Sequence, residues 1–201
     1  MGEENKGSSE RQVVIFALGN EEFGVNISEV REIIRMERIT TIPNTMEYIK
    51  GVINLRGGII VVIDLAMKLG FPSKESDNNT RIIVINVENN TVGMIVDSAT
   101  EVLRLANGQI APPPPAITQK IEANYIEGVG ILGDRLLILL DLARVMQSKE
   151  MAKVKEIERK AETVIKAEAS KAELEKQDAK EATAQAPVSN PPQAPPEGIA
   201  S

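Results

Sequence analysis

Two of the side-chain types that most often carry out catalysis are missing from this sequence. The chain contains no histidine and no cysteine, which excludes the commonest general base, the commonest protein metal ligand and every thiol nucleophile. Asp64 and Asp141 are candidates for a pair of acid–base carboxylates. Each of them, however, ends an apolar run and precedes a short helical pattern, where aspartate is a preferred N-cap residue. We therefore interpret both aspartates as structural and predict no catalytic or metal-binding site.

Arg56 is the side chain that a purely structural account leaves unexplained. It lies in the stretch GVINLRGGIIVVIDLAMKL, residues 51–69, beside two glycines that separate two apolar runs. Glycine pairs between strand-like runs allow the positive φ angles of two-residue hairpin turns, so we predict a hairpin that turns at Gly57 and Gly58. A guanidinium bonds and stacks in a fixed geometry and is a frequent interface anchor. We favour a binding role for Arg56 over a solvated surface charge or a local ion pair.

The composition argues against several other classes of function. A net charge of −6 offers no basic surface for nucleic acid. The glycine-rich pieces LRGG and GVGILGD lack the spacing and strand–helix context of phosphate loops. No apolar run approaches the roughly 20 residues that span a bilayer, and the first residues, MGEENKGSSERQ, lack the apolar core of a signal peptide. We expect a cytoplasmic protein with no cofactor and no direct membrane insertion.

The elements that must position Arg56 are short strands. Residues 12–27, QVVIFALGNEEFGVNI, predict a hairpin that turns at Gly19 and Asn20. Ser28 then predicts the N-cap of a brief helix, SEVREIIR, with its apolar residues at helical spacing. Residues 71–79, FPSKESDNN, form a polar connector. Aromatic residues make up only 2% of the chain, so β-branched residues and leucine must fill the core, which favours sheet.

After the connector the chain repeats itself. An offset of 69 aligns residues 12–36 with 81–105, and an offset of 77 aligns residues 48–66 with 125–143. The second pair reads YIKGVINLRGGIIVVIDLA over YIEGVGILGDRLLILLDLA. Two blocks that match in the same order indicate an internal duplication.

The duplication acts as an internal control on Arg56. Positions filled alike in both halves, such as Gly51 and Gly128, are explained by the fold that the halves share. Arg56 aligns with Gly133, and Asn54 aligns with an isoleucine. The shared fold does not demand Arg56 or Asn54, so we expect their function to be specific to one half.

Each half offers about five short strands with turn signals and little helix, which is typical of a small β-barrel rather than a parallel sheet. We predict an all-β protein of two packed barrels, and the sequence leaves open whether the barrels exchange strands. The Pro112–Pro115 run is interpreted as a rigid connector rather than a polyproline ligand. The expected organisation is a disordered N-terminus at 1–10, a folded domain at 11–147 with halves at about 11–70 and 80–147, a charged helical tail at 148–184 and a proline-rich disordered tail at 185–201.

The charged tail carries a short apolar stripe at helical spacing, which consists of Val154, Ile157, Ala161 and Val164. This stripe is too short to predict a coiled coil. Glutamate–lysine pairs four residues apart support helix formation.

The motifs FGVNISEVREIIR and TTIPNTMEYIKGVINLRGGIIVVIDLAMKLG, with their counterparts in the second half, resemble CheW, a family of bacterial chemotaxis coupling proteins. The resemblance extends over about residues 12–146, and the combination IKGVINLRG…VIDL is specific to this family and its close relatives. It implies two packed SH3-like barrels of five strands and no enzymatic activity. It also implies an adaptor that links the cytoplasmic tips of chemoreceptors to the regulatory domain of the histidine kinase CheA, in arrays at the membrane.

The resemblance also implies where the partners bind, without separating kinase from receptor. The matching positions are Val30, Glu32, Ile33, Gly51, Asn54 and Arg56. Judged from the residues alone, Val30 and Ile33 also fit core positions on the inner face of a short helix. Glu32 fits a solvated charge or a structural role, capping or pairing, that it shares with its counterpart Glu101.

Two alternatives remain at the level of the sequence. A paralogous coupling protein in a pathway for surface motility, or for another output, would show the same motifs. A small β-barrel enzyme would show a deep polar pocket with titratable residues instead. The chain departs from the family pattern in its long tail, and the sequence shows no receiver or kinase domain.

Overall fold

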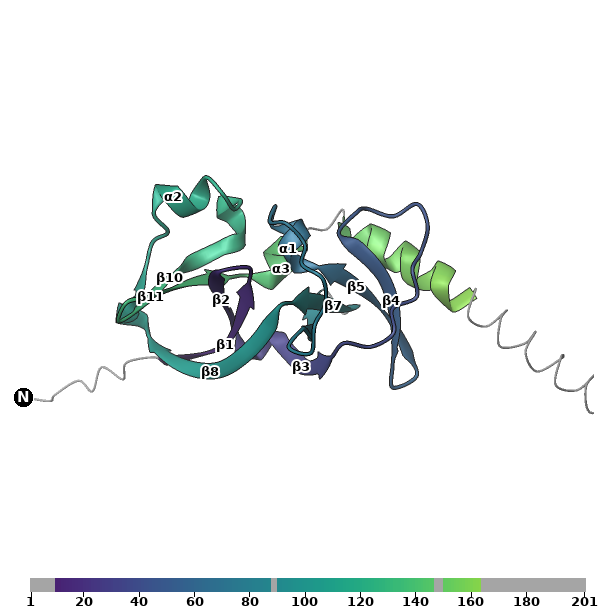
Figure 1. Cartoon of the computed structure of the whole chain (residues 1–201), viewed down its shortest axis with the longest axis horizontal. Helices are drawn as coiled ribbons and strands as arrows, with labels where there is room; N and C mark the ends of the chain where they lie inside the picture. The colour runs from purple at the N-terminus through teal and green to yellow at the C-terminus, as the bar shows by residue number, and fades with distance from the viewer. Residues whose placement is uncertain (1–9, 88–89, 147–149, 164–201) are drawn as a thin grey trace, which may run out of the picture. The chain divides into compact units, whose positions relative to one another are not determined.

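The computed structural model describes residues 10–87, 90–146 and 150–163, which form two β-sheets with short helices between and beside them (Figure 1). In spatial order the first sheet holds β8 (Ser98–Ala106), β1 (Glu10–Leu18), β2 (Glu21–Asn26), β11 (Arg135–Leu140), β10 (Ile126–Leu132) and β9 (Ile110–Ala111). The second sheet holds β3 (Val30–Arg35), β6 (Arg81–Val87), β7 (Asn90–Val96), β5 (Gly58–Asp64) and β4 (Ile49–Leu55). The all-β prediction is confirmed.

The helical elements among the described residues are short, apart from a helix over residues 150–163. They are α1 (Leu65–Lys68), α2 (Pro115–Thr118), α3 (Leu142–Val145) and single 3-10 turns at Ile27–Glu29, Asn107–Gln109 and Ala123–Tyr125. None of the described helices has the length and apolar character needed to cross a membrane.

The two sheets exchange hairpins between the two halves of the chain. Hairpin β1–β2 joins the sheet that contains β8, β10 and β11, whereas β6–β7 joins β3, β4 and β5. Equivalent parallel pairings make both junctions, Gly24 opposite Leu139 in the first sheet and Gly93 opposite Val62 in the second. The repeat offsets convert the strand order β3-β6-β7-β5-β4 into β8-β1-β2-β11-β10. The halves therefore exchange strands reciprocally, which answers the question that the sequence left open.

The exchange gives the strands two buried faces. A central core takes side chains from both sheets, and the rings of Phe16 and Phe23 stack there with centroids 5.8 Å apart. Each sheet also encloses a smaller core of its own. These smaller cores consist of Val13, Ile15, Leu105, Leu137 and Leu139 in the first sheet and Ile53, Ile60, Val62, Ile82 and Val84 in the second. Successive residues of β1 thus enter different cores, which explains continuous apolar runs without polar alternation.

The predicted helix SEVREIIR is wrong. Residues 27–29 form a single 3-10 turn, and Val30–Arg35 is strand β3, in which inward and outward residues alternate. Asn26 rather than Ser28 caps the turn, since its side chain accepts a hydrogen bond from the Ser28 N–H at 3.0 Å. The segment is a strand because β6 supplies backbone hydrogen-bond partners along its length. A register shift between Val30 and Glu32 locally interrupts the regular pairing of the two strands.

The turn and cap predictions are confirmed where the sequence signal is local. Gly19, with a φ of 61°, turns the β1–β2 hairpin. The Asp64 carboxylate accepts a hydrogen bond from the Met67 N–H at 3.0 Å and caps α1, and Asp141 accepts one from the Arg144 N–H at 2.9 Å and caps α3. Both aspartates are therefore accounted for as capping residues.

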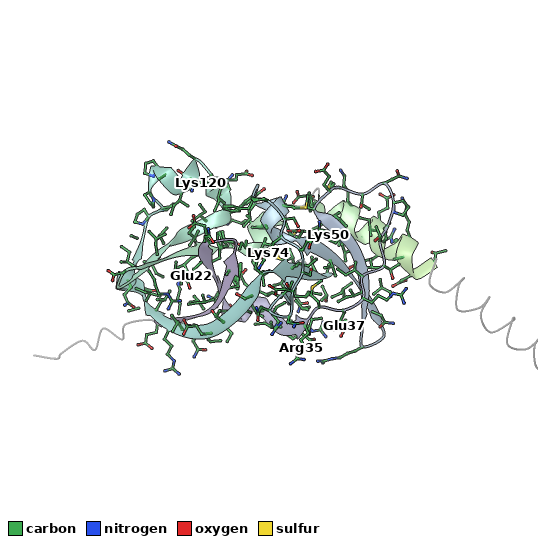
Figure 2. The ribbon with its side chains drawn as sticks, viewed as in Figure 1. Glu22, Arg35, Glu37, Lys50, Lys74 and Lys120 are labelled. Atoms are coloured by element: carbon green, nitrogen blue, oxygen red, sulfur yellow. The ribbon has the colours of Figure 1, made fainter. Side chains whose placement is uncertain are left out.

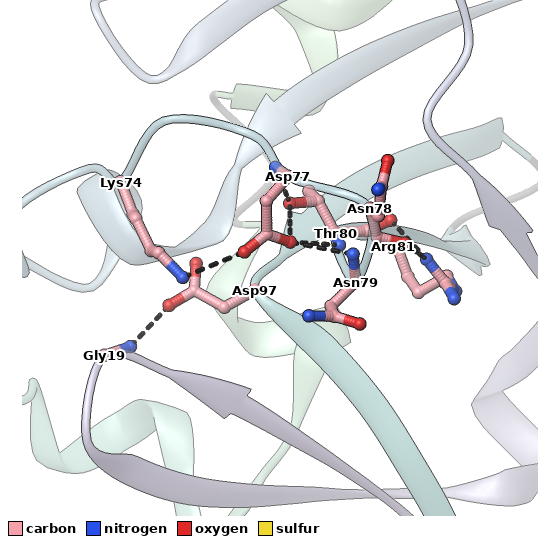
Figure 3. A network of polar contacts seen from close by, with 8 residues as sticks. All are labelled: Gly19, Lys74, Asp77, Asn78, Asn79, Thr80, Arg81 and Asp97. Atoms are coloured by element: carbon pink, nitrogen blue, oxygen red, sulfur yellow. Dashed lines mark hydrogen bonds and ion pairs between the residues drawn. The ribbon is translucent and has the colours of Figure 1, made fainter.

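The polar connector at residues 71–79 is held by side-chain contacts (Figure 3). The Asp77 carboxylate accepts hydrogen bonds from the backbone N–H groups of Asn79 at 2.7 Å and Thr80 at 3.1 Å. Nearby, Asp97 accepts a hydrogen bond at 2.7 Å from the N–H of Gly19. This bond ties the β1–β2 turn to the crossing of the chain from β7 to β8.

The helix over residues 150–163 buries its apolar stripe in the central core. Val154, Ile157 and Ala161 are all buried there, together with Met151. This helix accounts for the start of the predicted helical tail. The predictions for residues 1–9, 147–149 and 164–201, Val164 included, lie outside the described residues.

Candidate partner-binding site

The β4–β5 hairpin turns at Arg56 and Gly57, one residue earlier than the sequence predicts. Leu55 pairs with Gly58 across the hairpin, so Gly58 already belongs to β5. Arg56 has a φ of 52° and Gly57 a φ of 90°, and two positive φ angles are typical of a two-residue type I′ turn. The equivalent Gly133 has a φ of 61°. The shared fold therefore demands a left-handed residue here, and placing arginine in this conformation costs about 1–2 kcal/mol.

Asn54 stabilises this turn. Its side-chain oxygen accepts a hydrogen bond from the Gly57 N–H at 2.8 Å, which fixes the loop while leaving Asn54 exposed. The equivalent isoleucine of the second half cannot form this bond. Asn54 thus offsets part of the strain at Arg56.

Arg56 and Glu32 join the two outer strands of the second sheet. Arg56 Nη2 lies 2.7 Å from Glu32 Oε2, and their side chains are 77% and 19% exposed. Glu32 is on β3 and Arg56 follows β4, the strands at opposite ends of the sheet order. A pair this exposed contributes only about 0–1 kcal/mol. No other described residue bonds to Arg56, so most of its N–H donors face solvent.

The six residues predicted for partner binding do not form one surface. The hairpin brings together Glu32, Asn54 and Arg56. Ile33, 40% exposed, lies on the other face of β3. Val30 is half-buried against the central core. Gly51 is buried in β4 at a register shift, where a Cβ would lie 2.1 Å from the Thr40 carbonyl oxygen.

A pocket of about 390 Å³ adjoins the Arg56–Glu32 pair. Its walls come from β3, the β4–β5 hairpin, the start of β7 and the helix over residues 150–163. The lining residues are Arg31, Glu32, Leu55, Arg56, Gly58, Ile59, Ile60, Asn90, Thr91 and Glu158. Sequence reasoning missed Arg31, whose guanidinium donates to the Thr91 hydroxyl at 3.3 Å, and Glu158. Only the sheet order and the position of the C-terminal helix bring these residues together.

The first sheet contains a counterpart of the Arg56–Glu32 pair. Glu101 occupies the position of Glu32 in the repeat, and Arg135 bonds to it at 3.2 Å and to Glu22 at 2.8 Å; Figure 2 labels Glu22. The bond from Arg135 lowers the pKa of the Glu22 carboxyl. An arginine partner for the glutamate of β3 or β8 is therefore common to both halves, which confirms a shared pairing role for Glu32 and Glu101. The expectation that the ion pair of Arg56 belongs to one half alone is wrong. Only the placement of the arginine within the turn is specific to Arg56.

The surroundings of the two pairs differ. Beside Arg135, Ile131 and Leu136 face each other across the β10–β11 hairpin and are 58% and 46% exposed. Their counterparts beside Arg56 are the exposed amide Asn54 and the half-buried Ile59. One hairpin is thus centred on polar groups and the other on apolar ones.

Other charged groups serve capping and packing. Glu29, in the turn between β2 and β3, accepts a hydrogen bond from the Leu142 N–H at 3.2 Å at the start of α3. Burial, followed by the nearby charge of Asp141, raises the pKa of Glu29 to about 7. Across residues 10–87, 90–146 and 150–163, no group of three or more acidic side chains is arranged to hold a metal ion.

Comparison with known proteins finds a matching family model, similar sequences and a similar crystal structure. A family model described as a CheW-like domain matches residues 12–150. The chemotaxis protein CheW of Klebsiella aerogenes is 44% identical over 145 residues, which cover 72% of this chain and 86% of that protein. CheW of Bacillus subtilis is 31% identical over 138 residues, 69% of this chain and 88% of that protein. A crystal structure of the scaffolding protein TtCheW from Thermoanaerobacter tengcongensis matches with a TM-score of 0.65 and 32% identity, over 75% of this chain and 96% of that one.

Proposed function

The chain belongs to the CheW family of chemotaxis scaffold proteins, and from this premise we propose that it couples chemoreceptors to the kinase CheA. In this role it is a non-enzymatic adaptor that binds the cytoplasmic tip of a receptor and the regulatory domain of the kinase at the same time. It acts in the cytoplasm, where the receptor arrays recruit it. Receptor state then biases kinase activity because both partners contact one rigid scaffold.

The observation that carries the proposal is Arg56. A strained arginine replaces the glycine that the turn prefers, its side chain is 77% exposed, and a single ion pair at 2.7 Å orients it. The pair adds too little stability to explain the strain. Strained residues persist where the side chain itself is needed, and an oriented guanidinium with free donors suits a carboxylate or carbonyl of a partner.

Two distinct hairpins support the idea of two simultaneous partners. The polar Arg56 hairpin lies on the second sheet, and the apolar Ile131–Leu136 hairpin lies on the first. Exposed apolar side chains that lie next to each other suit the apolar core of a protein interface. The difference between the hairpins allows each partner to select one of them.

Binding assays with the purified full chain test this function. The chain is titrated against a CheA regulatory domain and, separately, against a soluble receptor signalling fragment. We expect both to bind and Arg56→Ala to weaken at least one of them about tenfold or more, as removal of an interface anchor does. Arg11→Ala is the matched control, since it removes an exposed ion pair of 3.0 Å with Glu127 from the first sheet. If the unmodified chain binds neither partner, the proposal is wrong.

The proposed coupling role could serve either of two pathways, swimming chemotaxis or surface motility. A paralogous protein that serves surface motility would use the same two surfaces with other receptors. Deletion of the gene, followed by scoring of swimming chemotaxis and surface motility side by side, separates these two roles.

A further inference from the structure

The helix over residues 150–163 is a fixed wall of the pocket beside Arg56. Its apolar stripe is buried in the central core. At its first turn Glu150 forms an ion pair with Lys68 and accepts a hydrogen bond from the Tyr48 hydroxyl at 3.2 Å. The Lys68 ammonium in turn lies 4.9 Å from the centroid of the Tyr48 ring and 5.8 Å from that of Tyr125. The helix is therefore anchored by both apolar and charged contacts.

Glu158 lies on the core-facing side of this helix. Helical spacing places it one turn after Val154 and beside Ile157 and Ala161, positions whose side chains are buried. Glu158 itself is half-buried and lines the pocket. No hydrogen bond or ion pair connects its carboxylate to another residue of the described chain. Burial and the charge of Glu162 raise its pKa, and only Lys155 acts in the opposite direction.

The pocket has the lining that a long basic side chain requires. The half-buried side chains of Leu55 and Ile59 supply apolar contacts for the methylene groups, and Glu158 supplies an anionic end. Of the two arginines that line the pocket, Arg31 donates to the Thr91 hydroxyl and Arg56 donates to Glu32. Neither of them bonds to Glu158. The volume of about 390 Å³ leaves room for one such side chain.

We propose that Glu158 receives a lysine or arginine side chain of the protein partner that binds at the Arg56 hairpin. This inference rests on the proposed function and deepens it, since it names the chemistry that the partner must present. Arg56 contacts an acceptor of the partner, and Glu158, across the pocket, contacts a cation. A partner with an acidic residue at this position is rejected by like-charge repulsion in a half-buried site. Glu158 is thus a specificity-determining residue.

The test measures dissociation constants of the full chain for the kinase regulatory domain and for the receptor fragment. Glu158→Gln removes the charge and keeps the shape, and Glu158→Lys reverses the charge. We expect about tenfold weaker binding of one partner for Glu158→Gln and a larger loss for Glu158→Lys. Glu156→Gln is the control, because Glu156 is exposed on the same helix and pairs only with helix residues. This control should leave both dissociation constants unchanged.

A second measurement distinguishes a binding role from a structural one. The ionisation of the Glu158 carboxyl is followed by NMR in the free chain and in each complex. A partner cation favours the ionised form, so we expect the pKa of Glu158 to fall in the complex that Glu158→Gln weakens. If Arg56→Ala weakens binding while Glu158→Gln and Glu158→Lys do not, the inference is wrong and the proposed function stands. If the unmodified chain binds neither partner, both fail.

Discussion

Replacing Arg56 with glycine, and separately with alanine, distinguishes the backbone strain of the turn from the contribution of the arginine side chain. Arg56→Gly and Arg56→Ala both delete the guanidinium and its ion pair with Glu32. They differ in the backbone, because alanine keeps the penalty of a φ of 52° and glycine does not. The loss of the ion pair, 77% exposed on the arginine side, costs about 0–1 kcal/mol in each variant.

The difference between the two variants therefore isolates the strain. Left-handed geometry costs an alanine about 1–2 kcal/mol, and glycine loses about 0.4–1 kcal/mol through the greater freedom of its unfolded chain. We expect Arg56→Gly to be more stable than Arg56→Ala by about 0.5–1 kcal/mol. Urea unfolding followed by circular dichroism measures this difference from the transition midpoints.

The same pair of variants should lose partner binding equally. Arg56→Gly would then be the more stable of the two variants without being the better binder, as expected of a residue retained for function at some expense in stability. The reasoning is refuted if Arg56→Gly is less stable than Arg56→Ala, or if Arg56→Gly binds both partners as tightly as the unmodified chain.

Three further predictions concern the scaffold. Because the pKa of Glu29 is raised, its contribution to stability is fully present below about pH 4.5 and is lost as the pH rises through about 7. After allowance for its partial exposure, the loss of stability is on the order of 1–2 kcal/mol. Thermal melts from pH 5 to 8.5 should show this loss, and Glu29→Gln should give a flatter profile of melting temperature against pH. Gly51→Ala should destabilise the fold by more than about 3 kcal/mol, because the alanine Cβ would lie 2.1 Å from the Thr40 carbonyl oxygen. A melting temperature close to that of the unmodified chain would contradict this close approach of Gly51 to Thr40. Val154→Ala should destabilise the fold by about 2 kcal/mol, because Val154 is 1% exposed in the central core. Urea unfolding measures this loss, and an unchanged transition midpoint would mean that the helix does not pack against the core.

Local signals in the sequence predicted local structure well. Gly19 and the two capping aspartates were identified because each acts within a few residues of its own position. The Arg56 turn was displaced by one residue because R-G-G contains two possible turn pairs. The sequence favours Gly57 and Gly58 as the turn residues, whereas the pairing of Leu55 with Gly58 between β4 and β5 makes Arg56 and Gly57 the turn residues.

Features that depend on distant contacts escaped prediction. The segment SEVREIIR has apolar residues at helical spacing, yet β6 pairs with it and makes it a strand. The exchange of hairpins leaves no local trace, since the same strands would serve a contiguous barrel. Glu158 was missed because a lone glutamate in a charged helix is ordinary in sequence, and only the packing of the helix places it in the pocket.

The repeat was the most informative feature of the sequence, and its use had a limit. It correctly marked Arg56 as differing from its counterpart. It did not reveal that Arg135, two positions beyond that counterpart, reaches the equivalent glutamate. Alignment compares positions, whereas an ion pair depends on where the end of a long side chain lies.

The central claim is that this scaffold holds receptor and kinase at the same time, and one sedimentation experiment tests it most directly. Receptor signalling fragments assembled on vesicles are pelleted with the kinase, with and without the full chain. The proposal predicts that the kinase enters the pellet with the chain present and that Arg56→Ala reduces this recovery while Arg11→Ala does not. If the chain binds each partner alone but the kinase displaces it from the receptor, the two partners compete for one surface and the claim is contradicted.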